Sequence, residues 1–273
     1  MMITKNQNDQ NDQNNRKTQV KLTVAYDGTA YCGFQSQRNA VGVESVLNEA
    51  LSKVAAHPVM VLGASRTDAG VHAKGQVVTF FLRGSIPVAQ IPAAVNCLLP
   101  RDIAVTAAEA VAADFHCRYD AVGKHYRYTV KNSHIPSPFD YRYVYAYGGK
   151  LALDLMASTA EVFIGEHDFT AFTATHSGRR NFVRRLDRIL ISREGDNVYL
   201  DFWGGGFLYK MVRSIAGCLI DIGRGHLDAA VAQRALLAKD RGLLSLTAPA
   251  RGLTLIKIYY NDEYFLDKDK PIR

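Results

Sequence analysis

One polar segment of the chain, residues 63–73, carries the residue types best suited to chemistry. It reads Gly-Ala-Ser-Arg-Thr-Asp-Ala-Gly-Val-His-Ala. Asp68 follows Arg66 by two positions, so an extended backbone places both side chains on the same side. A neighbouring guanidinium keeps a carboxylate ionised, and such a carboxylate can act as nucleophile, general base or metal ligand. An Asx turn with a surface salt bridge accounts for the same residues, so both interpretations stay open.

Asp68 and His72 also have the spacing of a metal-binding pair on a helix. The glycines on both sides predict a loop instead, and no third ligand follows. The chain contains no P-loop and no strand–GxGxxG–helix motif. Gly204–Gly206 precede an expected helix and could receive a phosphate at its N-terminus, which is a weak signal. We therefore expect no metal site.

Two basic runs are candidates for binding nucleic acid. The run at 179–193 includes Arg179, Arg180, Arg184 and Arg185. The run at 116–131 alternates cations with aromatic residues such as Tyr126. Cations bind phosphates and aromatic rings stack on bases, so this pattern is typical of RNA-binding surfaces. A solvated strand face with scattered charge is the alternative interpretation.

The composition predicts a folded basic protein. The chain has 273 residues, of which 48% are hydrophobic, and 33 Lys and Arg outweigh 26 Asp and Glu to give a net charge of +7. This hydrophobic content excludes disorder for most of the chain, and the length suggests about two units of ~150 residues. No run approaches ~18 apolar residues, so we expect no membrane span. The four cysteines form no C-x-x-C pair, and residues 1–18 lack an apolar signal region, so we expect a cytoplasmic protein.

Strand and helix patterns alternate irregularly, which favours an α+β fold over a doubly wound parallel sheet. Strands are expected at 20–26, 58–62, 76–82, 103–109, 125–131, 142–147, 182–192, 197–203 and 253–260. Helices are expected at 43–56, 87–98, 151–164, 207–222 and 228–237. The helix at 207–222 has a wide apolar stripe, with Lys210, Arg213, Ser214 and Asp221 on its other side. Gly217, one turn after Arg213, leaves space for a ligand beside that arginine, although a surface arginine is the default interpretation.

Taken together, the motifs resemble those of the TruA-type tRNA pseudouridine synthases. The segment Arg66–Ala73 resembles the family signature, and four further regions match in the same order. These are Val24–Thr29 with Gly33–Gln35, Phe115–Tyr119 with Lys124–Tyr128, Phe207–Arg213, and Pro249–Leu255. The resemblance covers about residues 20–261. Phe34, Ser65, Cys117 and Glu44 depart from the usual family residues, and none of them removes a reactive group.

The resemblance implies two ferredoxin-like halves with mixed or antiparallel sheets around a central basic cleft. The halves would span residues 19–115, with the catalytic loop, and 116–262, flanked by a polar tail at 1–18 and a tail at 263–273. It also implies a homodimeric isomerase that needs no cofactor. Such an enzyme binds tRNA across both subunits and converts uridine to pseudouridine at positions 38, 39 and 40 of the anticodon stem–loop.

The resemblance also assigns roles to individual residues. Asp68 corresponds to the catalytic nucleophile, and the ordinary aspartate pKa of about 3.9 leaves it ionised at neutral pH. Arg66 corresponds to the residue that helps hold the flipped nucleotide, because a base in a stem must leave the stack before it can react. The remaining roles are an active-site tyrosine that stacks on uracil (Tyr126), an arginine paired with the aspartate (Arg213) and an apolar neighbour of the tyrosine (Leu253 or Leu255). The run at 179–193 would contact tRNA phosphates.

Two other functions are compatible with part of the sequence. A non-catalytic RNA-binding protein explains the cations and aromatic residues, but not the loop with Arg66 and Asp68. A metal-dependent hydrolase would use Asp68 and His72, and activity that survives a strong chelator would exclude it. Release of tritium from uridine labelled at carbon 5 distinguishes a synthase from a binding protein.

Overall fold

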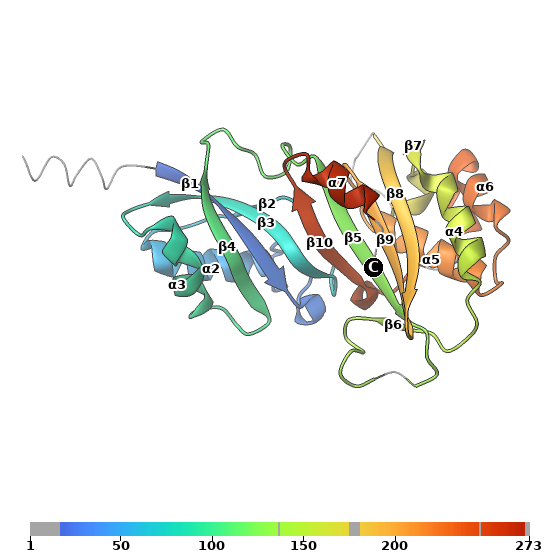
Figure 1. Cartoon of the computed structure of the whole chain (residues 1–273). Coiled ribbons are helices and arrows are strands. Elements are labelled where there is room, and N and C mark those ends of the chain that lie inside the picture. Colours follow the sequence, from blue (N-terminus) through green and yellow to red (C-terminus); the bar gives the residue numbers. More distant parts are fainter. Residues whose placement is uncertain (1–16, 136, 175–180, 246, 271–273) are drawn as a thin grey trace, which may run out of the picture. The chain divides into compact units, whose positions relative to one another are not determined.

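The structure is a computed structural model that describes residues 17–135, 137–174, 181–245 and 247–270 (Figure 1). The chain divides into two compact units. The first unit comprises the residues up to Ala69 together with Ala73–Asp120. The second comprises Gly70–His72 and the residues from Ala121 onward. Asp68 is thus close in sequence to the point where the chain passes to the second unit.

The first unit is a four-stranded antiparallel sheet with two helices. Its elements are β1 (Lys17–Tyr26), α2 (Val43–Ala55), β2 (Leu62–Gly63), β3 (His72–Arg83), α3 (Ile91–Asn96) and β4 (Ile103–Val111). The strands lie in the order β4-β1-β3-β2, and each neighbouring pair is antiparallel. Alternate residues of β1, from Val20 to Tyr26, are buried, which gives the sheet one core face. This β-α-β-β-α-β order is that of a ferredoxin-like unit.

The second unit repeats this arrangement. Its strands are β5 (Gly123–Lys131), β6 (Tyr145–Ala146), β7 (Gly165–Asp168), β8 (Val183–Glu194), β9 (Asn197–Gly204) and β10 (Leu253–Tyr259). Its helices are α4 (Leu153–Ala160), α5 (Met211–Gly223), α6 (Ala230–Ala238) and α7 (Glu263–Asp269). The antiparallel order β10-β5-β9-β8-β7 contains the same ferredoxin-like core, and the short β6 joins β5 in parallel. The α+β class predicted from the sequence is therefore confirmed.

Several predicted elements differ in extent. The strand expected at 58–62 is reduced to Leu62–Gly63, and the tyrosine-rich strand expected at 142–147 is reduced to Tyr145–Ala146. The helix expected from Phe207 begins only at Met211, because Lys210 has a left-handed backbone (φ 60°) that interrupts the helix. Gly204–Gly206 therefore do not lie at a helix N-terminus, and the phosphate site suggested there is wrong.

Helix α5 is buried on nearly all sides, which corrects its expected polar face. Ser214 and Asp221 are 1% and 0% exposed. Asp221 forms an ion pair of 2.7 Å with Arg224 and accepts a hydrogen bond from Ser245. Ser214 accepts a hydrogen bond from Arg241. These polar residues therefore attach α5 to the segment that follows α6.

Helix α7 lies within the segment 263–273 that the sequence pattern predicts as a tail. Its Tyr264 is 2% exposed and packs with Trp203 and Tyr259 in a small aromatic cluster. The Tyr264 hydroxyl donates a 2.6 Å hydrogen bond to Asp187. Across the described ranges, no helix is both long and apolar enough to cross a membrane.

Candidate active site

The loop that carries Asp68 is attached to strand β3 through the side chain of Gln76. Main-chain pairing of β2 with β3 continues to Ala64, whose N–H donates to Val77 O at 2.9 Å. At the next residue the Gln76 amide replaces a strand partner. Its Oε1 accepts from Ser65 N at 3.2 Å, and its Nε2 donates to Ser65 O at 2.7 Å. Gln76 is completely buried, so this side chain determines where the loop leaves the sheet.

Strand β1 holds the same loop at Thr67. The Tyr26 hydroxyl lies 2.7 Å from Thr67 Oγ1, and Gln76 Nε2 donates to that hydroxyl at 3.4 Å. Burial raises the pKa of Tyr26 to about 12, although the hydrogen bonds with Thr67 and Gln76 oppose the shift. Tyr26 is therefore a neutral hydrogen-bonding group throughout the physiological pH range.

A third contact comes from the loop after β1, at Gly33. Phe34 N donates to Thr67 O at 3.1 Å. Gly33 has φ +96°, and a Cβ there would lie 2.7 Å from Thr67 O and 3.3 Å from the carbonyl carbon of Asp68. Only glycine allows the two backbones to approach so closely. Thr67 is therefore held from two directions, while Asp68 beside it is half-buried and Arg66 is exposed.

Two departures from the family pattern are explained by this geometry. Ser65 is not among the residues with positive φ, so its position does not require the usual glycine. Phe34 is 2% exposed and lies against Gly63, where an added Cβ would be 2.2 Å from the ring. Both residues therefore fit the loop as it stands.

His72, the other half of the suggested metal pair, belongs to the second unit and contacts other residues of that unit. It is 3% exposed, and its Nε2 lies 3.0 Å from Arg142 O. Its ring meets Tyr143 edge-on at 5.1 Å. In the part of the chain that is described, no group of three or more His, Cys, Asp or Glu is placed to hold a metal ion.

Strand β5 of the second unit carries Tyr126. This residue is 5% exposed, and its ring meets Phe207 edge-on at 5.1 Å. Leu255 lies directly opposite Tyr126 on β10, whereas Leu253 lies opposite Tyr128. Of the two leucines predicted as neighbours of the tyrosine, Leu255 is thus its cross-strand partner.

Arg213 lies in the first turns of α5 and is half-buried. Its Nε donates to Ala248 O at 2.8 Å, and Ala248 N donates back to Arg213 O at 3.0 Å. Burial raises the pKa of Tyr128, and the positive charge of Arg213 opposes this shift. The second unit therefore brings Arg213 close to Tyr128 and to the segment before β10.

Two members of the basic run at 116–131, His125 and Arg127, bind a buried carboxylate on the neighbouring strand β9. Asp201 is 0% exposed and accepts from His125 Nε2 at 2.6 Å. Arg127 binds both oxygens of Asp201, at 2.8 and 3.0 Å. The His125 ring stacks on Trp203 with centroids 4.2 Å apart. Arg127 therefore forms an ion pair with the buried Asp201, and His125 binds the same carboxylate.

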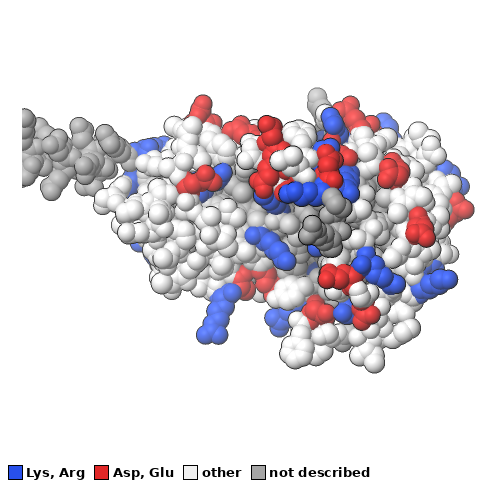
Figure 2. Space-filling view, in the orientation of Figure 1, with Lys and Arg blue, Asp and Glu red and all other residues white. Residues whose placement is uncertain are grey.

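The basic run on β8 is also engaged with the rest of its own unit. Arg179 and Arg180 lie outside the described residues. Arg184 donates to Asn181 O at 3.4 Å, and Arg185 forms an ion pair of 2.7 Å with Asp187 while its side chain stays 70% exposed. On the face that Figure 2 shows, Lys and Arg alternate with Asp and Glu over α7. Lys257 there contacts both Glu263 and Asp267.

The residues that position the loop were not among the candidates from the sequence. Gln76 is a polar residue at the start of an otherwise apolar strand, and that irregularity is the signal that could have indicated it. Tyr26 and Gly33 lie within a segment that resembles the family, but the sequence alone does not show what they contact. Their role depends on β1 and β3 being neighbours.

Comparisons with known proteins identify the family of this chain. The profile of a family described as tRNA pseudouridine synthase matches residues 22–120 and 159–261. The tRNA pseudouridine synthase A of Geotalea daltonii is 42% identical over 241 residues, which cover 88% of this chain and 99% of that protein. That of Limosilactobacillus fermentum is 43% identical over 246 residues, which cover 88% and 95%. A solved H/ACA ribonucleoprotein with substrate RNA has 15% identity to this chain and a TM-score of 0.34, and the match covers 74% of this chain and 43% of that one. With more than half of its residues matched by the family profile, the chain belongs to the tRNA pseudouridine synthases, a family of isomerases.

Proposed function

We propose that this protein isomerises uridine in the anticodon stem–loop of tRNA, with Asp68 as the nucleophile. The bond between uracil N1 and the ribose breaks, the uracil turns while bound, and its carbon 5 forms the new bond to the ribose. The hydrogen on carbon 5 leaves as a proton and N1 gains one, so atoms balance without an outside reactant. The observation that supports this proposal is the loop bound to Gln76, Tyr26 and Phe34, which leaves Asp68 half-buried beside the exposed Arg66.

Other residues have proposed roles that follow their positions within each unit. Arg66 would hold the flipped nucleotide, and its exposed guanidinium is free to reach RNA. Tyr126 would stack on the uracil, with Leu255 as its apolar neighbour on β10. Arg213, whose Nε is bound to Ala248 O, would keep Asp68 ionised. Each role needs its own variant, because family membership alone does not assign it.

The test of the nucleophile is Asp68→Asn. We expect tRNA binding to persist and tritium release from uridine labelled at carbon 5 to disappear, because the amide is a poor nucleophile. Asp114→Asn is the control, since it removes an exposed carboxylate from the same unit. Substantial turnover by Asp68→Asn would overturn the assignment, and a wild-type protein that binds tRNA without releasing tritium would indicate a binding protein. Mapping pseudouridines in treated tRNA determines whether the product lies in the anticodon arm.

We further propose that the enzyme is a cytoplasmic homodimer that binds one tRNA across both subunits. In this proposal, the half at residues 19–115 supplies the catalytic loop, and the half at 116–262 supplies the tyrosine and the arginine of the site. Analytical ultracentrifugation with and without tRNA measures the assembly. A monomer that turns over at full rate would contradict the dimer.

A further inference from the structure

Arg241 bridges the two segments that hold Arg213. Its Nη1 donates to Ser214 Oγ at 3.3 Å, and its Nη2 donates to Thr247 Oγ1 at 2.6 Å. Ser214 follows Arg213 directly on α5. Thr247 precedes Ala248, which makes two hydrogen bonds with Arg213. The guanidinium of Arg241 therefore joins the chain neighbours of both partners in the Arg213–Ala248 contact.

Backbone oxygens of a third segment bind the same guanidinium. Nη1 of Arg241 donates to Thr173 O at 3.3 Å and to Ala171 O at 3.5 Å. These oxygens belong to the short 3-10 helix η4 (Thr170–Phe172) and to the residue after it. Helix η4 packs against both α5 and α6. Arg241 thus ties three separate segments of the second unit together at one planar group.

A short 3-10 helix of its own, η5 (Arg241–Leu243), holds the backbone of Arg241. Asp240 precedes this helix, and its Oδ1 accepts from Gly242 N at 2.7 Å. Leu244 N donates to Arg241 O at 3.0 Å. The side chain of Arg241 is half-buried, so its hydrogen bonds are partly shielded from water, which strengthens them.

The contacts of Arg241 require a branched donor. A guanidinium is planar and carries five N–H groups in a fixed fork, whereas a lysine ammonium is a single point of charge on a flexible stem. Two different nitrogen atoms of Arg241 reach Ser214 and Thr247 at the same time. Replacement by lysine would therefore keep the charge but break the bridge between the two segments.

We propose that Arg241 is a positioning residue for the isomerisation, which acts by fixing the direction of Arg213. The proposal rests on the proposed function, in which Arg213 keeps the Asp68 carboxylate ionised. Without Arg241, the segment at Thr247–Ala248 can move relative to α5, so the Arg213 guanidinium loses its fixed direction. Arg241 acts through Arg213 and not by contact with the substrate.

The test is Arg241→Gln in the full-length chain, assayed by tritium release over a range of tRNA concentrations and pH values. We expect kcat to fall about 10- to 100-fold with KM within about threefold of wild type, because a displacement of about 1 Å in an active-site group can cost about 100-fold in rate. A displaced Arg213 stabilises the Asp68 carboxylate less, so the acid limb of the kcat profile should move to higher pH. Arg241→Lys should lose about as much kcat as Arg241→Gln.

Thr247→Val is a second variant, which decides the question if Arg241→Gln fails to fold. It removes the 2.6 Å hydrogen bond with little change in shape, so kcat should fall about 3- to 10-fold. Arg224→Gln is the matched control, because Arg224 holds the other end of α5 through its 2.7 Å ion pair with Asp221. It should lower the melting temperature and leave kcat and its pH profile unchanged.

The proposal would be overturned if folded Arg241→Gln and Thr247→Val proteins kept the kcat and the acid limb of wild type. It would also be overturned if Arg224→Gln lowered kcat as much as Arg241→Gln, since a general loss of stability would then explain both. Failure of the proposed function has a different result, namely a wild-type protein that forms no pseudouridine or an Arg213→Gln variant with full kcat. Neither of these results depends on Arg241, so the two failures are separate.

Discussion

The side chain of Gln76 should affect the rate of the reaction, because it binds the backbone of the loop that carries Asp68. Gln76→Met keeps a similar length and removes the amide. Ser65 N and Ser65 O then lose their hydrogen bonds with Gln76, of 3.2 and 2.7 Å. A buried polar group without a partner costs about 1–3 kcal/mol. Because Ser65 is half-buried and water can reach part of it, the lower end applies, and the total is about 2–4 kcal/mol.

We expect the loss of these hydrogen bonds to shift the loop and thereby to displace Asp68. A displacement of about 1 Å in a catalytic group can reduce the rate about 100-fold, and 1.4 kcal/mol corresponds to a factor of about ten. We therefore expect kcat to fall about 100-fold, with KM for tRNA within a few-fold of wild type. The melting temperature should fall by about 4–16 °C if the full cost is also lost from stability. A domain with a stability of about 5–15 kcal/mol remains folded.

The assay is tritium release at saturating and limiting tRNA, together with thermal unfolding of the same samples. Thr79→Val is the control, because Thr79 is a buried polar residue of the same strand whose partner on β2 is Leu62, which precedes the loop. It should leave kcat unchanged. If Gln76→Met lowered the melting temperature as expected but kept kcat within threefold of wild type, Gln76 would stabilise the sheet without positioning Asp68.

Two other predictions concern the backbone of the site and the pH dependence of stability. Gly33→Ala should lower kcat at least tenfold, because its Cβ would meet Thr67 O at 2.7 Å. Gly84→Ala is the matched control in steady-state assays, because Gly84 has a similar positive φ (+122°) but an added Cβ there would have no atom within 4 Å. Equal losses of kcat in the two variants would contradict the steric argument. The hydrogen bond from Lys270 lowers the pKa of Asp267 in the folded protein. The ionised Asp267 carboxylate therefore stabilises the fold above about pH 4, and this stabilisation is lost as the pH falls through the lower folded pKa. Asp267→Asn should therefore flatten the acid limb of a urea-unfolding profile, and parallel profiles for the two proteins would refute this.

The sequence allowed the fold class and most of its elements to be predicted because hydrophobic periodicity is a local property. The alternating pattern at 20–26 corresponds to β1, and the helical pattern at 43–56 corresponds to α2. Local patterns failed where apolar residues served a different purpose. Phe207 continues the helical pattern of α5, but it lies before the helix and packs against Tyr126.

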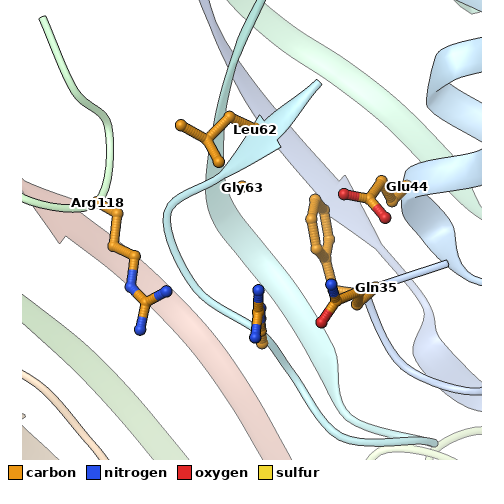
Figure 3. Close-up of a pocket in the computed structure, with 7 residues that line it drawn as sticks. Gln35, Glu44, Leu62, Gly63 and Arg118 are labelled. Atoms are coloured by element: carbon orange, nitrogen blue, oxygen red, sulfur yellow. The ribbon is translucent and has the colours of Figure 1, made fainter. Parts of the chain in front are cut away.

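The charge pattern was a poorer guide than the hydrophobic pattern. Cations on β5 predict a nucleic-acid surface, yet His125 and Arg127 both bind the buried Asp201. Asp201 is far from them in sequence and becomes their neighbour only because β5 pairs with β9. Arg118 belongs to the same run, but it is exposed and lines a surface pocket together with Arg66 (Figure 3).

The amino-acid sequence by itself determined the α+β class, the family resemblance and the loop containing Asp68, because these depend on residue types at short spacing. Only the tertiary structure decided how that loop is held. Gln76, Tyr26 and Gly33 come from separate segments, and they reach the loop because β3 lies beside β1 and β2. Hydrogen bonds and backbone contacts across strands join residues that are distant in sequence. Such contacts leave no local pattern, and for that reason the support of the site could be described only from the folded chain.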